Sequence, residues 1–229
     1  VVFLHEGLGS ARQWKDFPDR LGAATGCGFL AYSRWGYGGS DARPRPWPAD
    51  FLEPEAAAVL PALLDAAGVA RPVLFGHSDG ATIALMHAAA CPDAVRGIIS
   101  EAAHVMIEDI SVKGITGARD RFLHGDLRAR LRSQHGDHVE DTVLGWTGAW
   151  LGPGGRDWDI RPRLQAIRCP VLLIQGRDDN FGTLEQVDAI ATRVSGPADT
   201  LILDDCGHIP HRERPRDVLE AATRFIERL

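Results

Sequence analysis

The chain has 229 residues, of which 45% are hydrophobic and 24% charged, a composition that suits one globular domain or one domain with an insertion. Its formal net charge of −6 argues against binding to nucleic acid or to an anionic membrane surface. No apolar run approaches the ~20 residues of a membrane span. The four scattered cysteines lack metal-ligand spacing and fit reduced thiols in a cytoplasmic protein.

Short apolar runs alternate with helical patterns along the chain, which predicts an α/β fold with a mostly parallel sheet covered by helices on both faces. Strands are predicted at 1–5, 28–33, 72–76, 95–102, 170–176 and 200–205, and helices at 10–24, 54–67, 79–90, 183–194 and 215–228. The opening residues, VVFLHEG, have the pattern of a strand already under way. We therefore expect that one or two N-terminal strands of the sheet are missing from this chain.

The alternation of strands and helices stops between residues 105 and 168. This stretch contains helical patterns, such as HVEDTVLGWTGAWL at 138–151, and no clear strand. The sequence therefore predicts a core formed by 1–104 and 169–229, with 105–168 as a helical cap insertion.

Residues 76–80, GHSDG, match the pattern G-x-S-x-G between a predicted strand and a predicted helix. So sharp a turn strains the backbone of the serine and leaves no room for side chains two residues away, which explains Gly76 and Gly80. This turn at residues 76–80, called the elbow below, also lifts the hydroxyl above the carboxyl edge of the sheet, where open α/β folds bind ligands. Ser78 is therefore the candidate nucleophile.

A serine hydroxyl needs a base to take its proton, commonly a histidine held by a carboxylate. Asp178 and Asp179 follow a predicted buried strand, and His208 follows the last strand. The alternative base is His211, three residues further on. The alternative acid is Glu101, at the end of the predicted strand 95–102. The order Ser, Asp, His along the chain is the one expected for this architecture.

Four segments in combination resemble the α/β-hydrolase superfamily over nearly the whole chain. They are HEGLGS at 5–10, GHSDG at 76–80, GRDD at 176–179 and GHIPH at 207–211. The resemblance implies the α/β-hydrolase fold, a helical cap where 105–168 lies, and two further strands before the first strand of this chain.

The resemblance also implies roles for single residues. Ser78 is the expected nucleophile, His208 the base and Asp179 the acid, because each stands where the family places that residue. The backbone N–H groups of Gly7 and Asp79 are the expected oxyanion hole. Asp178 and His211 are then expected to have other roles, and Glu101 remains a rarer alternative acid.

One residue departs from the family pattern, because Glu6 stands where the family usually has glycine. A carboxylate that pointed into the oxyanion hole would oppose negative charge, so we expect this side chain to point away or to bind a neighbour. Glu6, Asp79, Glu101 and Glu108 together would favour a cationic substrate if they all gathered near the site.

The residues Leu8, His104, Trp146 and Trp150 are expected to line a substrate pocket, since ligand pockets tend to be apolar and aromatic. Aromatic residues at helical spacing also fit simple packing of one helix on another. If these residues line a pocket, that pocket favours a small to medium apolar acyl group.

The expected activity is a serine hydrolase that cleaves carboxylic esters, lactones or thioesters through an acyl-enzyme, with no metal or organic cofactor. The alternatives are a C–C bond hydrolase of vinylogous diketones with the same triad, and a receptor-like binding protein without activity. A dehalogenase is disfavoured, since that chemistry places aspartate at the elbow. A small molecule is the expected partner, and an exposed sheet edge would favour a homodimer.

Overall fold

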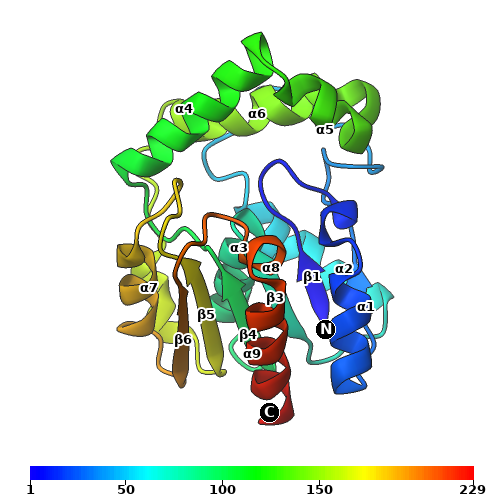
Figure 1. Ribbon diagram of the computed structural model, residues 1–229, viewed down its shortest axis with the longest axis vertical. Helices are drawn as coiled ribbons and strands as arrows, with labels where there is room; N and C mark the ends of the chain where they lie inside the picture. The colour runs from blue at the N-terminus through cyan, green and yellow to red at the C-terminus, as the bar shows by residue number, and fades with distance from the viewer.

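Six parallel strands form one sheet in the computed structural model, which describes residues 1–229 (Figure 1). Their order across the sheet is β2-β1-β3-β4-β5-β6. The strands are β1 (Val2–Leu4), β2 (Leu30–Ala31), β3 (Val73–His77), β4 (Gly97–Glu101), β5 (Val171–Gly176) and β6 (Ala198–Leu203). Every pair of neighbours is parallel, so the predicted parallel sheet is confirmed.

Nine α-helices and four short 3-10 or π-helical turns connect these strands. The helices are α1 (Phe17–Thr25), α2 (Leu60–Ala66), α3 (Asp79–Ala90), α4 (Asp109–His124), α5 (Leu127–His135), α6 (Val139–Leu151), α7 (Leu184–Ala191), α8 (Pro210–Glu213) and α9 (Pro215–Glu227). The short turns are η1 (Ala11–Trp14), η2 (Glu55–Val59), η3 (Gly136–His138) and η4 (Arg161–Ala166). None of the helices combines the length and apolarity that crossing a bilayer requires.

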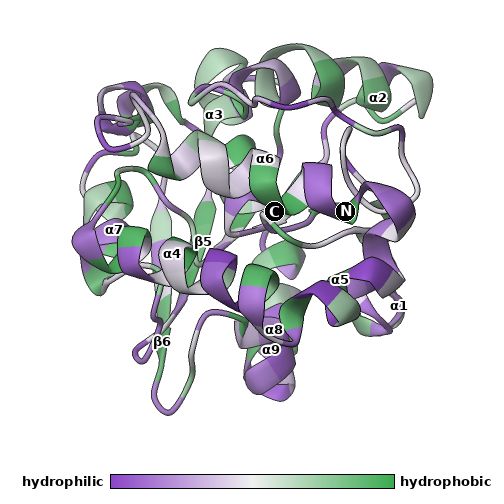
Figure 2. Cartoon of the chain, turned by 90° about the horizontal axis from the view of Figure 1, so that it is seen from above, coloured by the Kyte–Doolittle hydropathy of each residue, from purple (hydrophilic) through white to green (hydrophobic).

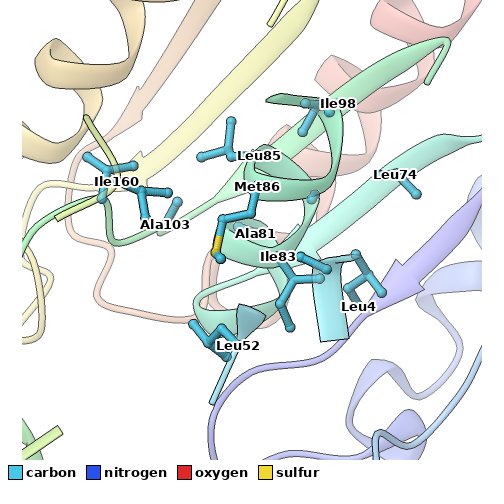
Figure 3. Close-up of a cluster of buried hydrophobic side chains, with 14 of the residues drawn as sticks. Leu4, Leu52, Leu74, Ala81, Ile83, Leu85, Met86, Ile98, Ala103 and Ile160 are labelled. Carbon is cyan, nitrogen blue, oxygen red and sulfur yellow. The ribbon is translucent and has the colours of Figure 1, made fainter. Parts of the chain in front are cut away.

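Successive residues of each strand point to opposite faces, and each face has its own hydrophobic core. On one face, Leu74 belongs to a core that also contains residues of α2, α3 and α7. Figure 3 shows part of this core, with Ile83, Leu85 and Met86 on α3 and with Leu4 and Leu74 on the strands β1 and β3. On the other face, Phe75 packs with residues of α1 and α9. Helices on both faces were predicted, and the structure confirms them.

Two predicted elements near the N-terminus are shorter than expected. The helix predicted at 10–24 divides into η1 and α1, because the backbone at Lys15 has a positive φ of 50° and cannot continue a helix. The strand predicted at 28–33 pairs with β1 only through Leu30 and Ala31, at the edge of the sheet.

The helices α4, α5 and α6 lie across the carboxyl edge of the sheet (Figure 1). They all come from 105–168, and the only pairing in this stretch is an isolated antiparallel bridge between Met106 and Asp159. Seen from above, α5 is mainly hydrophilic, whereas α6 carries more hydrophobic residues (Figure 2). Residues that follow β3, β5 and β6 therefore face α4, α5 and α6.

Candidate active site

The turn between β3 and α3 places Ser78 in a strained conformation, with φ 53° and ψ −119°. The flanking glycines are required by close backbone contacts. A Cβ on Gly80 would lie 1.9 Å from the carbonyl oxygen of Leu4, and one on Gly76 would lie 2.4 Å from the backbone of Ala81. The serine hydroxyl is thus held above the carboxyl edge of the sheet at the first turn of α3.

Three residues that are far apart in the sequence meet at this point. His208 Nε2 lies 3.0 Å from Ser78 Oγ, and His208 Nδ1 lies 2.8 Å from Asp179 Oδ2. Because a carboxylate accepts hydrogen bonds, Nδ1 carries the proton in this pair and Nε2 is left to accept from the serine hydroxyl. The imidazole can therefore take a proton from the serine while the carboxylate holds the ring.

The carboxylate of Asp179 is fixed by donors from its own loop and strand. Its Oδ1 accepts from the backbone N–H of Phe181 at 2.8 Å, and its Oδ2 accepts from Nε2 of Gln175 at 2.7 Å. Asp178, by contrast, is exposed, and only its backbone N–H is bonded, to the carbonyl of Cys206. The structure thus brings Asp179, of the two neighbouring aspartates, to the histidine.

Burial and mutual attraction shift the pKa values of the two partners. Burial alone would raise the pKa of Asp179, but the charge and hydrogen bond of His208 hold it below its usual 3.8. Burial would likewise lower the pKa of His208, and the nearby Asp179 carboxylate instead raises it above 6.5. Each group stabilises the charged form of the other, as a carboxylate that supports an imidazolium must.

Phe181, which sequence reasoning missed, covers the histidine. Its ring lies 4.6 Å from the His208 ring, measured between centroids, with 36° between the planes. Gln175 was also missed, although a polar residue inside the buried strand VLLIQG is a visible signal for a side chain that needs a buried partner. Both residues restrict the movement of the Asp179–His208 pair.

A second buried histidine–carboxylate pair lies behind the first. Glu101 accepts from Nδ1 of His211 at 2.8 Å and from the His211 backbone N–H, and both side chains are fully buried. His77 lies nearby, and the three side chains offer ligand atoms within 4.8 Å of one another. The ring nitrogens of His77 are already bonded, to Gln13 and to the carbonyl of His208. The arrangement is therefore that of a hydrogen-bonded network rather than a metal site.

The loop after β1 lies beside the elbow. Glu6, whose carboxylate was expected to point away or to bind a neighbour, accepts from the backbone N–H of Leu8 at 3.0 Å. The N–H of Gly7 has no acceptor in the structure. The N–H of Asp79 is at the first position of α3, where no intrahelical acceptor exists. These are the two donors that were expected to form an oxyanion hole.

The side chain of Asp79 is buried between two partners. It accepts from Nε1 of Trp146 at 3.0 Å, and Nη2 of Arg34 lies 3.7 Å from the same oxygen. Burial raises the pKa of Asp79 to about 6, although Arg34 and Trp146 oppose this shift. Arg34 was not foreseen from the sequence, because nothing in the loop that carries it reveals this contact.

A cavity of about 480 Å³ lies above the serine and is lined in part by residues of α4, α5 and α6. All four residues that were expected in a pocket line it, namely Leu8, His104, Trp146 and Trp150. It is lined as well by Leu127 and by residues that sequence reasoning missed, namely Ile107, Ile115, Ala118, Leu131, Gln134, Asn180, Phe181, Ile209 and the arginines 121, 130 and 212. The pocket is thus mixed, with an apolar interior and several charged groups.

The four carboxylates Glu6, Asp79, Glu101 and Glu108, considered above as a possible acidic cluster, do not all lie at the site. Glu6 and Asp79 line the cavity. Glu101 lies under the sheet edge against His211, and Glu108 caps α4 and accepts from Thr183. The condition for a preference for cationic substrates, that all four carboxylates gather near the site, is therefore not met.

Comparison with known proteins identifies the family. The model of the Alpha/beta hydrolase family matches residues 1–222 of the chain. The chain belongs to the alpha/beta hydrolase family. This membership agrees with the parallel six-stranded sheet and with the serine at the turn between β3 and α3.

Curated relatives of this alpha/beta hydrolase include enzymes with different names. Epoxide hydrolase A of Mycobacterium tuberculosis is 32% identical over 44% of the chain and 33% of that protein. The serine hydrolase BPHL of Mus musculus is 26% identical over 86% of the chain and 68% of that protein. The 2-hydroxy-6-oxo-6-phenylhexa-2,4-dienoate hydrolase of Comamonas testosteroni is 23% identical over 99% and 87%. The chain thus spans a third of the first relative and about two thirds of the second.

Solved structures of other hydrolases share the fold of this alpha/beta hydrolase. A serine hydrolase from Cycloclasticus zankles superposes with a TM-score of 0.80 at 18% identity, covering 99% of this chain and 89% of that one. The enol-lactonase of Burkholderia xenovorans superposes with a TM-score of 0.77 at 22% identity, covering 99% and 90%. At these identities the likeness concerns the fold alone.

Proposed function

We propose that this chain is a serine hydrolase that cleaves carboxylic esters, including lactones and thioesters, of small to medium apolar acyl groups. The observation that carries the proposal is the position of His208, within hydrogen-bond distance of both Ser78 Oγ (3.0 Å) and Asp179 Oδ2 (2.8 Å). An imidazole that bridges an alcohol and a carboxylate is the arrangement that activates serine for attack on a carbonyl.

In the proposed reaction, Ser78 Oγ attacks the carbonyl carbon of the ester while His208 Nε2 takes the hydroxyl proton. Asp179 stabilises the imidazolium and keeps its Nδ1 proton in place. The imidazolium then protonates the leaving alcohol, and an acyl-enzyme remains on Ser78. Water, deprotonated by His208, attacks the acyl carbon; the bond to Ser78 Oγ then breaks, the imidazolium returns its proton to that oxygen, and the acid is released.

The negative charge on the tetrahedral oxygen needs donors that are already in place. The N–H groups of Gly7 and Asp79 are proposed for this role, because the first has no other acceptor and the second begins α3. Removal of one such donor typically lowers kcat by about 10²–10³-fold. The positive end of the α3 dipole adds to the stabilisation.

The substrate range follows from the cavity. Its volume of about 480 Å³ suits a small molecule, and Leu8, Trp150, Ile115 and Leu131 give it an apolar interior. We therefore expect short and medium acyl chains to be cleaved faster than long ones. A series of p-nitrophenyl esters with increasing chain length measures this preference.

Labelling with a fluorophosphonate tests the proposal directly. Phosphonylation requires an activated serine, so we expect one adduct, which peptide mass mapping places on Ser78. Loss of the adduct in Ser78→Ala and a strongly reduced labelling rate in His208→Ala are expected. The absence of any adduct on folded wild-type protein would overturn the proposed activity and favour the receptor-like alternative.

Two neighbouring aspartates provide a matched control. Asp179→Asn is expected to lower kcat by about 10⁴-fold, since the histidine then loses the partner that sets its tautomer. Asp178→Asn changes the same chemical group one residue earlier, at an exposed side chain, and is expected to keep kcat within about twofold. Equal losses in the two variants would contradict the assignment of Asp179.

C–C bond hydrolysis of vinylogous diketones is the second candidate. It is favoured by the dienoate hydrolase of Comamonas testosteroni, whose match extends over 99% of this chain. The same three residues would serve both reactions, so only substrates distinguish them. Higher kcat/KM for a ring-cleavage dienone than for any p-nitrophenyl ester would replace ester hydrolysis by this reaction.

A further inference from the structure

One side chain of the helical segment 105–168 reaches the elbow below it. Trp146 lies on α6, and its Nε1–H donates to Oδ2 of Asp79 at 3.0 Å. Both side chains are buried, with Trp146 5% and Asp79 3% exposed. A buried hydrogen bond to a carboxylate is stronger than a neutral one and is costly to leave unmade.

The same indole ring is packed against the loop after β1. A Cβ on Gly7 would lie 2.1 Å from Nε1 and 2.4 Å from Cε2 of Trp146. No positive φ requires glycine at this position, so the ring itself excludes any larger residue. Trp146 thus contacts both residues whose N–H groups are the proposed oxyanion donors.

Arg34 completes the arrangement from the side of the core. Its Nη2 donates to the carbonyl oxygens of Glu6 at 2.9 Å and His5 at 3.3 Å, and it lies 3.7 Å from Asp79 Oδ2. The carboxylate of Asp79 therefore lies between a cation that holds the loop after β1 and an indole N–H from α6. The Asp79 carboxylate thus connects the loop after β1, the turn at Ser78 and the helix α6.

We propose that Trp146 is a positioning residue that couples α6 to the oxyanion hole. The N–H groups of Gly7 and Asp79 are then aligned when α6 packs over the carboxyl edge of the sheet. The proposal rests on the proposed hydrolase function and deepens it. A carboxylate one residue from the nucleophile would repel the developing oxyanion if its charge were unpartnered. The bond from Trp146 draws that charge away from the reacting oxygen and holds the Gly7 loop in place.

The coupling predicts a particular kinetic change. Trp146→Phe keeps an aromatic ring in the pocket but loses the N–H, so we expect kcat to fall about 10- to 100-fold while KM changes less than about threefold. Affinity for a trifluoromethyl ketone, which binds serine as a tetrahedral oxyanion, is expected to fall by the same factor as kcat/KM. Trp146→His, which keeps a ring N–H, is expected to recover part of the loss.

A double-mutant cycle isolates the bond to Asp79. In the background of Asp79→Asn the carboxylate charge is gone, so Trp146→Phe is expected to lower kcat less than about threefold further. Trp158→Phe is the matched control, because Trp158 belongs to the same segment, packs on Trp150 and does not line the cavity. It is expected to leave kcat unchanged.

The outcomes separate the proposal from its alternatives. A rise in KM alone in Trp146→Phe, or the same loss of kcat with and without the Asp79 carboxylate, would show a mere lining role and overturn the coupling. Thermal melting identifies a variant that has lost its fold, and Trp146→His then carries the test. Failure of the hydrolase proposal itself would appear separately, as an unlabelled Ser78 in the wild-type chain.

Discussion

His77 Nε2 donates a 2.7 Å hydrogen bond to the backbone carbonyl oxygen of His208. The next residue, Ser78, lies 3.0 Å from the ring of the same histidine. The dipeptide His77–Ser78 therefore contacts both the backbone and the side chain of His208. Burial and the neighbouring histidines hold the pKa of His77 well below 6.5, so the ring is neutral and can donate through Nε2 while Nδ1 accepts from Gln13.

This contact predicts that His77 positions the base. His77→Leu removes the donor, and we expect kcat to fall about 10- to 100-fold, because a shift of about 1 Å in a catalytic group has an effect of this size. His77→Gln can place an amide N–H near the position of Nε2 and is expected to retain more activity. Steady-state kinetics with thermal melting of both variants measures the effect. Identical kcat values for the two variants would contradict a role for the donated bond.

The pKa of His208 predicts the acid limb of the pH profile. The base must be neutral to accept a proton, and Asp179 raises the pKa of His208 above 6.5 against the opposing effect of burial. We therefore expect kcat/KM to rise with pH and to reach half its maximum above pH 6.5. In Asp179→Asn the largest raising influence on the pKa of His208 is gone and burial remains, so the residual activity should titrate at lower pH. An acid limb that does not move would assign it to another group.

The close approach of α3 to β1 predicts a strong effect of a single methyl group. Gly80→Ala places a Cβ 1.9 Å from the Leu4 carbonyl oxygen, where only backbone movement can relieve the contact. We expect the free energy of unfolding to fall by about 3 kcal/mol. Gly117→Ala in α4 is the matched control, because its Cβ would meet nothing within 4 Å, and it should stabilise the protein by roughly 0.5–1 kcal/mol. Urea unfolding of both variants tests the difference in sign.

The hydrogen-bond partner of Glu101 distinguishes a structural role for this carboxylate from a role as the acid that supports His208. Because both of its oxygens contact His211 and neither contacts His208, we expect Glu101→Gln to lower the free energy of unfolding by about 3 kcal/mol. Labelling of Ser78 in the folded variant should persist. A loss of labelling comparable with that of Asp179→Asn would restore Glu101 as the catalytic acid. Denaturant unfolding and labelling rates, measured on the same preparation, distinguish these outcomes.

Local patterns determined the alternation of strands and helices, the glycines of the elbow, and the candidates Ser78 and His208. The reason is that each depends on a short stretch of chain, such as a continuous apolar run or a turn that excludes side chains. The element boundaries do not follow from the pattern alone, as α1 shows, because a single residue with a positive φ interrupts the predicted helix.

Only the tertiary structure decided which buried charges meet. Asp179 and Glu101 both follow or end a buried strand, yet one faces His208 and the other His211. The contact of Trp146 with Asp79 likewise joins residues 67 positions apart. Such pairings depend on how strands are ordered in the sheet and on how α6 lies over its edge, and side-chain chemistry at one position carries no information about either.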